Sequence, residues 1–270
     1  MTHIKNIFTN KGMIKIMPIF YVISDVHGFY NEMQQALDTA GFDPKNKNHW
    51  IISCGDEWDR GPHPKEVMRY FNSLERKILI RGNHMNLFED LCQRGYPEYY
   101  DMLNGTTKTV QILGHYKPEF GFDSYCETAY NTTKKYRESL VNYFETERFV
   151  FCHSAVPAIG NNNLLAHYTK NRQFSFNPNW RNATQEEWNA AMWENPYLFA
   201  EQGLFPPDKI VVFGHFHTSW PRCHYEGKPE WGSGADFSSY YGKNYIAIDA
   251  CTAHSGRVNC LVLEDDFLEE

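Results

Sequence analysis

Three repeats of one pattern constrain the fold of this chain more than any other feature of its sequence. Each repeat is a short apolar run, a polar stretch containing Gly and Asp or Asn, and a segment with apolar residues at helical spacing. Strand–loop–helix units in succession indicate parallel strands in one sheet. The predicted strands are 20–23, 49–54 and 77–80, and the predicted helices are 31–40, 64–74 and one through Leu87, Phe88 and Leu91. The sequence therefore predicts an α/β fold.

The strand pattern continues through the rest of the chain but is interrupted twice. Residues 95–147 are rich in Tyr and lack alternating strands, so we interpret them as an inserted helical cap that includes a helix over 134–144. Residues 160–209 form a second irregular insertion. Within it, Thr184 followed by Glu187 has the spacing of a capping box and predicts a helix to about Trp193.

Later apolar runs complete the predicted architecture. Buried strands are predicted at 149–152 and 210–213, and two further strands, which we assign to a second sheet, at 245–249 and 257–263. We expect residues 18–270 to form a single domain, preceded by a weakly ordered extension over 1–17 and ending in a frayed acidic tail over 264–270.

Charge and composition exclude several classes of partner. The formal net charge is −7 and no cluster of Lys or Arg occurs, which argues against a nucleic-acid or anionic-membrane surface. The seven cysteines are scattered without a Cys-x-x-Cys pair, as is usual for reduced thiols. No apolar run approaches the roughly 18 residues of a membrane span, and no signal peptide is recognisable. We therefore expect a cytoplasmic protein, whose oligomeric state the sequence leaves unknown.

Polar side chains with metal-binding atoms follow five of the predicted strands. Because ligands collect at the carboxyl ends of strands in an open α/β sheet, these residues can meet although they are far apart in sequence. Carboxylate, amide and imidazole donors suit Mn²⁺, Fe²⁺ or Zn²⁺. Alone, each would be an ordinary turn, cap or surface residue. The seven candidate ligands are Asp25, His27, Asp56, Asn83, His153, His215 and His217.

Seven candidates are too many for one ion and suit two ions that share a carboxylate. Asp56 follows a buried strand and Gly55, and we assign it as the bridging ligand. Two dications, two carboxylates and one bridging hydroxide leave a net charge of about +1 at the site. Such a site favours a phosphate dianion as substrate.

The ordered set of motifs resembles that of the calcineurin-like metallophosphoesterase superfamily, in the branch with phosphoprotein phosphatases and bacterial diadenosine tetraphosphatases. The motifs are Asp25-x-His27-Gly28, Gly55-Asp56-x-x-Asp59-Arg60-Gly61, Gly82-Asn83-His84, His153 and Gly214-His215. The resemblance implies a two-sheet β-sandwich flanked by helices, with helical cap insertions. It also implies that Asp25, His27 and His217 bind the first metal, that Asn83, His153 and His215 bind the second, and that Asp56 binds both.

The chain departs from the family pattern at three places. Met85 stands where the family usually has Glu after Gly-Asn-His. No arginine occurs at 193–195, so Arg172 or Arg181 would have to supply a second phosphate contact. His217, the second histidine of Gly214-His215-Phe216-His217, is more typical of the broader superfamily. These differences concern the substrate more than the chemistry.

The predicted mechanism is attack on phosphorus by a hydroxide that bridges two metal ions. Arg60 would bind phosphoryl oxygens through its planar fork, together with Asn83 and His84 as substrate-binding residues. His84 would protonate the leaving oxygen, and Asp59 would pair with His84 and keep it protonated. The catalytic residues predicted by this scheme are thus His84, Asp59 and Arg60.

Three functions are compatible with the sequence. The leading interpretation is a phosphatase with two divalent ions, Mn²⁺ as first choice, that acts on phosphomonoesters of a small molecule or of phosphoserine and phosphothreonine in proteins. The second is hydrolysis of a diadenosine polyphosphate or another phosphodiester, with bases stacked on aromatic residues of the insertions. The third is a catalytically silent metal-binding scaffold, which leaves Arg60 and His84 without a purpose.

Overall fold

The computed structural model describes residues 17–115, 117, 119–160 and 174–268. The predicted extension over 1–17 therefore lies outside the described residues except for Met17. None of the helices in these described segments has the length and apolar character needed to cross a membrane.

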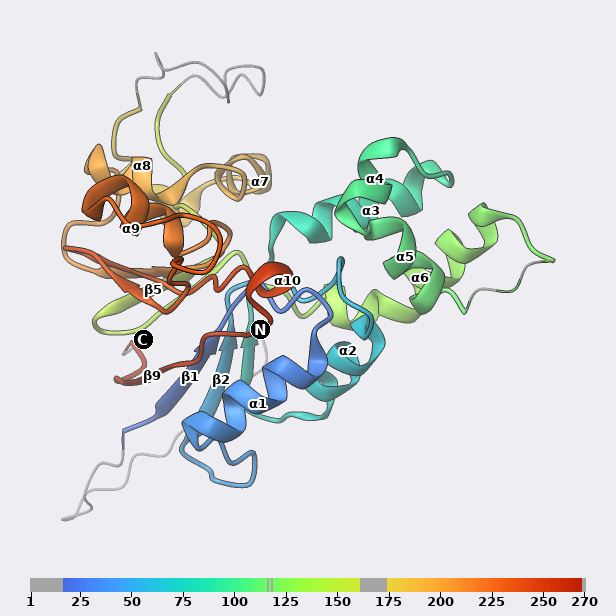
Figure 1. Cartoon of the computed structure of the whole chain (residues 1–270), viewed down its shortest axis with the longest axis horizontal. Helices are drawn as coiled ribbons and strands as arrows, with labels where there is room; N and C mark the ends of the chain where they lie inside the picture. The colour runs from blue at the N-terminus through green and yellow to red at the C-terminus, as the bar shows by residue number, and fades with distance from the viewer. Residues whose placement is uncertain (1–16, 116, 118, 161–173, 269–270) are drawn as a thin grey trace.

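The first sheet contains the three predicted βα units. Strands β1 (Ile19–Ile23), β2 (His49–Ser53) and β3 (Lys77–Leu79) are parallel, and β9 (Leu261–Glu264) adds an antiparallel edge beside β1. Helices α1 (Tyr30–Ala40), α2 (Pro64–Ser73) and α3 (Asn83–Arg94) follow the parallel strands in turn, as predicted (Figure 1). Their apolar faces and one face of the sheet share a core around Val67, Phe71 and Phe88.

The second sheet has the strand order β4-β5-β6-β8-β7. Its parallel centre consists of β5 (Phe149–Cys152), β6 (Ile210–Phe213) and β8 (Tyr245–Ala247), with β4 (Tyr143–Glu145) and β7 (Tyr240–Tyr241) as antiparallel edges. Buried side chains from both sheets, among them Phe20, Ile52, Phe151 and Val212, form one apolar cluster. The predicted two-sheet sandwich is thus confirmed.

Two predictions about the C-terminal strands were wrong. Of 257–263, only the last part is a strand, and β9 pairs with β1 of the first sheet instead of joining β8 in the second. The described part of the tail, which ends at residue 268, is not frayed as expected, because the Phe267 ring packs at 5.5 Å from Phe20 and 5.1 Å from Trp50. Apolar contact with the sandwich core therefore holds the segment that follows β9.

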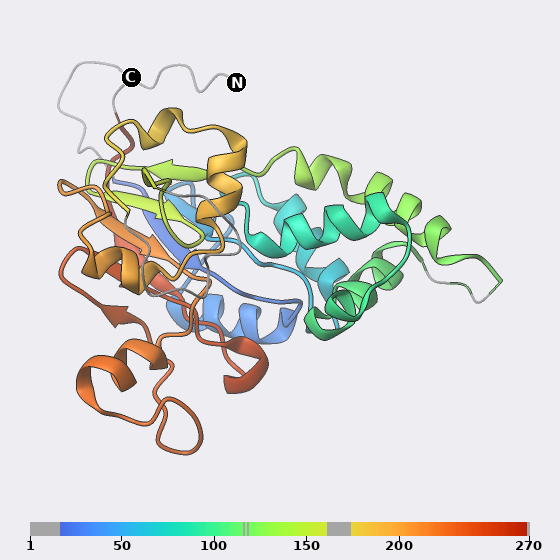
Figure 2. The same ribbon diagram turned by 90° about the horizontal axis from the view of Figure 1, so that it is seen from above.

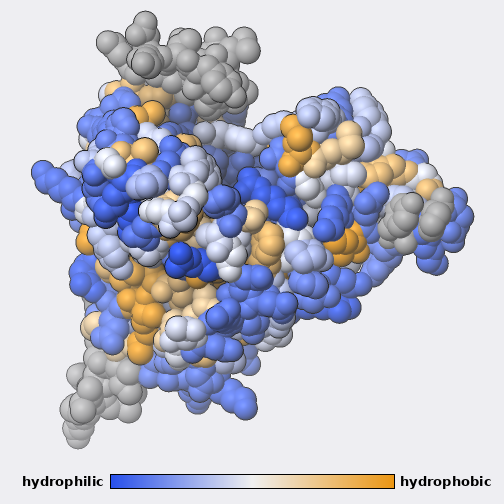
Figure 3. Space-filling model, in the orientation of Figure 1, coloured by the Kyte–Doolittle hydropathy of each residue, from blue (hydrophilic) through white to orange (hydrophobic). Residues whose placement is uncertain are grey.

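The predicted cap over 95–147 contains α4 (Tyr99–Asn104), α5 (Thr106–Leu113) and α6 (Phe122–Arg137), and α5 and α6 pack against α3. Figures 1 and 2 show these helices projecting to one side of the two sheets. Figure 3 shows apolar side chains gathered over α4, where Met102 is 56% and Leu103 65% exposed.

The helix predicted over 134–144 was wrong. Helix α6 ends at Arg137, and Tyr143–Glu145 forms edge strand β4. Phe144, which fits a helical spacing, instead packs its ring on Phe20 and Phe151 in the sandwich core. Pairing with β5 therefore overrides the local helical pattern.

The second insertion covers the outer face of the second sheet. Its described part contains a 3-10 turn at Trp180–Asn182, α7 (Gln185–Ala191) and α8 (Pro196–Glu201), while 161–173 lie outside the described residues. The predicted capping box is present, since Thr184 N donates to Glu187 Oε2 at 2.7 Å and Glu187 N donates to Thr184 Oγ1 at 3.3 Å. Two short helices complete the fold, α9 (Ser219–Glu226) and α10 (Thr252–Ser255).

Candidate active site

The loops after the parallel strands meet at one edge of the sandwich. Asp25 and His27 follow β1, Asp56 follows β2, and Asn83 is the first residue of α3 after β3. The loops after β1 and β2 are hydrogen-bonded to each other, from Asp25 N to Gly55 O at 3.0 Å and from His27 N to Asp56 O at 2.9 Å. His153 after β5 and His215 after β6 approach from the second sheet.

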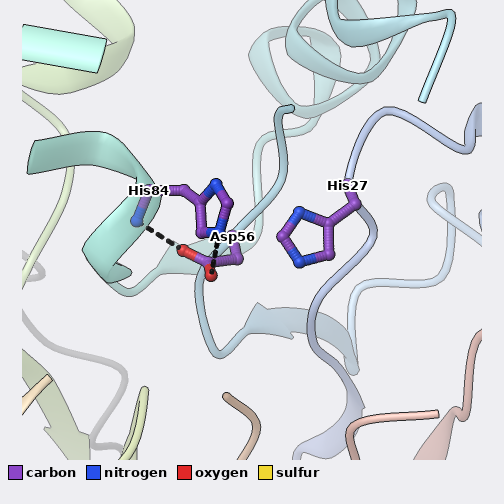
Figure 4. A group of neighbouring side chains, drawn as sticks. All are labelled: His27, Asp56 and His84. Carbon is purple, nitrogen blue, oxygen red and sulfur yellow. Dashed lines mark hydrogen bonds and ion pairs between the residues drawn. The ribbon is translucent and has the colours of Figure 1, made fainter. Parts of the chain in front are cut away.

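Two groups of potential metal ligands share the Asp56 carboxylate. His27, Asp56 and His84 form one group, and Asp56, His153 and His215 form the other, with the ligand atoms in each group within 4.8 Å of one another. Figure 4 shows the His84 ring next to the Asp56 carboxylate and the His27 ring facing both of them. Among the described residues, Asp56 alone belongs to both groups, and it is the residue assigned from the sequence as the bridge.

Asn83 extends the second group, since its Oδ1 lies 2.8 Å from His153 Nε2 and 3.1 Å from His215 Nδ1. Asp25 lies beside the first group, with Oδ1 3.8 Å from His27 Nε2. Burial raises the pKa of the Asp25 carboxyl to about 6. The structure therefore brings six of the seven predicted ligands together.

His217 is the predicted ligand that the structure does not bring into either group. Its Nε2 lies 3.3 Å from Glu230 Oε1, and its Nδ1 lies 2.9 Å from Ser219 Oγ. Burial lowers the pKa of His217 to about 4. Glu230 follows no strand and belongs to no motif, so the sequence offered no signal for this pairing.

Two candidate ligands are oriented by backbone carbonyls. His27 Nδ1 donates to Trp58 O at 2.9 Å, and His153 Nδ1 donates to Cys54 O at 2.8 Å. Each ring thereby directs its Nε2 at the shared centre. In histidines that bind metal through one ring nitrogen, the other ring nitrogen typically donates a hydrogen bond in this way.

The charges of the site favour metal binding over a neutral polar cluster. Burial would raise the pKa of the Asp56 carboxyl, but the imidazoles of His153 and His84 outweigh burial and hold this pKa well below its usual value. Burial lowers the pKa of His215 to about 3, and burial together with the Arg60 charge lowers the pKa of His27. Neutral imidazoles and an ionised carboxylate are the forms that bind metal ions.

His153 differs from the other histidines of the site. Burial would lower the pKa of its imidazole, but the Asp56 carboxylate, 3.4 Å from Nε2, raises that pKa to about 9. His153 must therefore lose a proton before its Nε2 can bind a cation. The donor types and their geometry fit two divalent ions that share Asp56.

Glycines allow the loops to approach the ligands closely. A Cβ atom at Gly82 would collide with Asp56 Oδ1, and a Cβ atom at Gly214 would collide with Asp25 Oδ2. Both positions therefore require a residue without a side chain.

Left-handed backbone conformations are concentrated at the site. Of the non-glycine residues with positive φ in the described segments, all but His115 lie in the loops that form it. Each costs about 1 kcal/mol or more and persists because the surrounding hydrogen bonds impose it. These residues are Asp25, His27, Asp56, Asp59, Arg60, His215 and Cys251, with φ between 49° and 72°.

A second set of side chains surrounds His84. Its Nδ1 donates to Asp59 Oδ2 at 2.7 Å, and the same oxygen accepts from Thr106 Oγ1 of the cap at 2.6 Å. Its Nε2 lies 3.9 Å from Asp56 Oδ2 and 3.3 Å from Arg60 Nη2. Arg60 itself is exposed. A cation accessible from solvent thus lies beside an oriented imidazole and the shared carboxylate.

Sequence reasoning missed the residues that support Asp25. Ser24 Oγ donates to Asp25 Oδ2 at 2.5 Å, and the backbone N of His215 donates to the same oxygen at 2.9 Å. Thr252 Oγ1, from α10, donates to Asp25 O at 2.8 Å. Ser24 could have been suspected from its position beside Asp25, whereas Thr252 is distant in sequence and carried no signal.

The departures from the motif pattern have structural counterparts. Met85 is buried in the core of the first sheet and its helices. Arg181 Nε and Nη2 donate to the Glu145 carboxylate at 2.7 and 2.6 Å, so this arginine is already engaged at β4, while Arg172 lies outside the described residues. Among the described residues, Arg60 is the arginine that lies beside a member of the ligand groups, with Nη2 3.3 Å from His84 Nε2.

The chain belongs to the calcineurin-like phosphoesterase family, whose sequence model matches residues 19–235. This family defines a class of metal-dependent phosphoester hydrolases, in agreement with the fold and the ligand groups.

Particular relatives share only part of the chain. A stretch of 98 residues is 34% identical to "Bis(5'-nucleosyl)-tetraphosphatase, symmetrical" of Buchnera aphidicola subsp. Schizaphis graminum, covering 34% of this chain and 35% of that protein. A stretch of 65 residues is 43% identical to the protein of the same name from Klebsiella pneumoniae, covering 24% of this chain and 22% of that one. The chain thus spans about a third or less of the curated relatives it matches.

A solved structure provisionally named as a diadenosine tetraphosphatase shares the fold. It has a TM-score of 0.50 and 13% sequence identity, and the alignment covers 96% of this chain and 97% of that one.

Proposed function

We propose that this protein hydrolyses a phosphoanhydride bond of a dinucleoside polyphosphate with the help of two divalent metal ions. The observation that carries the proposal is the Asp56 carboxylate, shared by two ligand groups, with the exposed Arg60 beside His84 of the first group. The substrate class is suggested by the names of the relatives. For a dinucleoside tetraphosphate cleaved symmetrically, one water adds and two nucleoside diphosphates leave.

Two bound ions would lower the pKa of a coordinated water and offset the negative charge of the polyphosphate. His27, with Asp25 beside it, would hold one ion, and Asn83, His153 and His215 would hold the other, with Asp56 between them. Two carboxylates carry two negative charges against the four positive charges of the ions. The assembled site therefore remains cationic and attracts an anionic substrate.

Arg60 and His84 supply the remaining chemistry. The Arg60 guanidinium can donate to two phosphoryl oxygens at once, and its neighbour His84 lies 3.3 Å away at Nε2. With Nδ1 donating to Asp59, His84 Nε2 faces Arg60 and Asp56, where it can deliver a proton to the oxygen that leaves phosphorus. Thr106 and Asp59 hold this ring in place from the cap side.

A substrate panel tests the proposal. Diadenosine tetraphosphate, p-nitrophenyl phosphate, its bis-ester and a phosphoserine peptide are each incubated with enzyme and Mn²⁺, and with chelator as the metal-free control. We expect chelator-sensitive release of ADP from the tetraphosphate, with a kcat/KM well above that for the peptide. Asp56→Asn measures background from contaminating phosphatases.

Two results would contradict the proposal. Faster turnover of the phosphopeptide would favour a protein phosphatase, the first interpretation of the sequence. Turnover of no compound with any of Mn²⁺, Fe²⁺ and Zn²⁺ would favour a silent metal-binding scaffold.

A further inference from the structure

A half-exposed tryptophan, Trp231, lies against the second histidine of the Gly214–His217 loop. Its ring centroid is 4.5 Å from that of His217, and the residue is 49% exposed. His217 is two residues from His215, a member of the Asp56 ligand group. Tryptophan has one of the largest apolar surfaces of any side chain, so leaving half of it in water is unfavourable unless a partner covers it.

Two further rings extend this contact toward α10. The Phe237 ring lies 6.1 Å from Trp231 and 5.5 Å from His254, and the His254 ring lies 5.2 Å from Trp231. His254 belongs to α10, whose Thr252 donates to Asp25 O at 2.8 Å. We call the four rings of His217, Trp231, Phe237 and His254 the aromatic platform. Through His217 and α10, the platform is connected to the loops that carry His215 and Asp25.

The segment that carries Trp231 is anchored at its base. Buried Arg222 donates from Nη1 to Ser238 O at 2.9 Å and from Nη2 to Ser239 O at 3.1 Å, and it pairs with Asp236 at 3.0 Å. Asn259 Nδ2 also donates to Phe237 O at 2.7 Å. The exposed indole is therefore presented from a fixed base.

We propose that the aromatic platform is a nucleobase-binding subsite, in which a base of the substrate stacks on Trp231 while its phosphates reach the two ligand groups. The inference rests on the proposed function and adds the residues that recognise the nucleoside. Stacking accepts any base because every base has a π-face. The platform lies outside the two insertions in which the sequence offered aromatic residues for base stacking. Tyr99 and Tyr100 of the first insertion are exposed on α4, but within the described part of the chain no ring contact joins them to a candidate ligand.

Equilibrium binding of two non-hydrolysable compounds tests the subsite without turnover. Adenosine 5'-(α,β-methylene)diphosphate and methylenebisphosphonate both carry two linked phosphonates, and only the first carries a nucleoside. Calorimetry with Mn²⁺ gives the ratio of their Kd values for each variant. We expect Trp231→Ala to weaken nucleotide binding about 10-fold, with bisphosphonate binding unchanged. Trp231→Phe, which keeps an aromatic face, should retain most of the affinity.

Tyr241→Ala is the matched control, because Tyr241 is a 65% exposed aromatic residue on edge strand β7, outside the platform. The ratio of the two Kd values measured for Tyr241→Ala should equal that of the wild type. Equal weakening of both compounds by Trp231→Ala would mean a structural role and would overturn the subsite. So would an unchanged ratio, or a Trp231→Ala effect confined to a phosphopeptide.

The same variants separate this inference from the proposed function. If the wild type does not cleave diadenosine tetraphosphate, but Trp231→Ala still weakens nucleotide binding, the subsite is supported and the proposed reaction is wrong. If Trp231→Ala cleaves the tetraphosphate with the same kcat/KM as the wild type, the proposed reaction is supported and the subsite is wrong.

Discussion

The oxygen Asp59 Oδ2 accepts hydrogen bonds from both His84 and Thr106, and this double contact fixes the orientation of the His84 ring. The Nε2 atom then faces Asp56 and Arg60. An imidazole held in this way is suited to protonate a departing oxygen, whose need for a proton depends on the basicity of the leaving group.

His84→Asn should therefore slow an alkyl phosphate about 100-fold more than p-nitrophenyl phosphate, because nitrophenolate leaves without a proton. Steady-state kcat for the two esters, measured with saturating Mn²⁺, gives the comparison. Asp59→Asn should change the same ratio in the same direction. Equal losses on both esters would exclude acid catalysis by His84.

The left-handed backbone conformation of Arg60 leads to a prediction about the stability of the folded protein. Glycine adopts φ of 61° without strain, whereas alanine does not. We expect metal-free Arg60→Gly to be about 1 kcal/mol more stable than Arg60→Ala in urea denaturation. The same pair at exposed Glu127 within α6 should show the opposite order, because glycine weakens a helix. A more stable alanine variant at both positions would show that the loop relaxes.

At the scale of elements, edge strand β4 is held by charge as well as by its ladder with β5. Burial would raise the pKa of the Glu145 carboxyl, but hydrogen bonds from Arg181 and Lys209 outweigh burial and hold this pKa below its usual value. A lowered pKa in the folded state means that the ionised form stabilises the fold above about pH 4.5. That stabilisation is lost as the pH falls through the folded-state pKa.

Glu145→Gln should accordingly lower the free energy of unfolding at pH 7 by about 1 kcal/mol, and the difference from the wild type should shrink below pH 4.5. Urea denaturation at pH 7, 5 and 4 measures this. Glu138→Gln, at an exposed i,i+4 pair with Lys134, is the matched control. A constant difference at every pH would mean that shape, not charge, anchors β4.

The elements that were predicted correctly are those that a pattern within a short stretch of sequence identifies. Apolar runs before Asp25, Asp56, Asn83, His153 and His215 identify five strand ends and hence the six candidate ligands that converge. The failures concern partners distant in sequence. Helical spacing around Phe144 does not reveal that β5 will pair with this segment, and the run at 261–264 does not reveal whether it will join β1 or β8. Such choices depend on packing between the sheets.

The pairing of His217 with Glu230 was unpredictable for the same reason. Glu230 lies in a segment between α9 and β7 that has no periodic pattern, and its position depends on anchoring by Arg222 and Asn259. The seventh ligand assigned by resemblance therefore stays a prediction, and the other six also await a metal-binding measurement.

At the scale of the whole molecule, the candidate ligands connect the two sheets. Asp25, His27, Asp56 and Asn83 come from the first sheet, and His153 and His215 come from the second. Ions that bind the assembled site but not the unfolded chain must stabilise this arrangement of the sheets.

Mn²⁺ at about 100 times its Kd should raise the free energy of unfolding by about 3 kcal/mol, seen as a higher Tm that chelator reverses. Asp56→Asn should abolish most of this shift together with stoichiometric metal binding. Asp208→Asn, at an exposed position, should keep both. Full Mn²⁺ binding by Asp56→Asn would refute the shared carboxylate.

The antiparallel pairing of β9 with β1 has a consequence for the order of folding. Strand β1 binds β2 on one side and β9 on the other, with Val22 opposite Leu261. During synthesis, the β1 edge of the first sheet therefore stays unpaired until residues 261–264 have been made. Contacts of such long range form slowly. The nascent chain is thus expected to be most vulnerable to aggregation along β1, next to the loop that will carry Asp25 and His27.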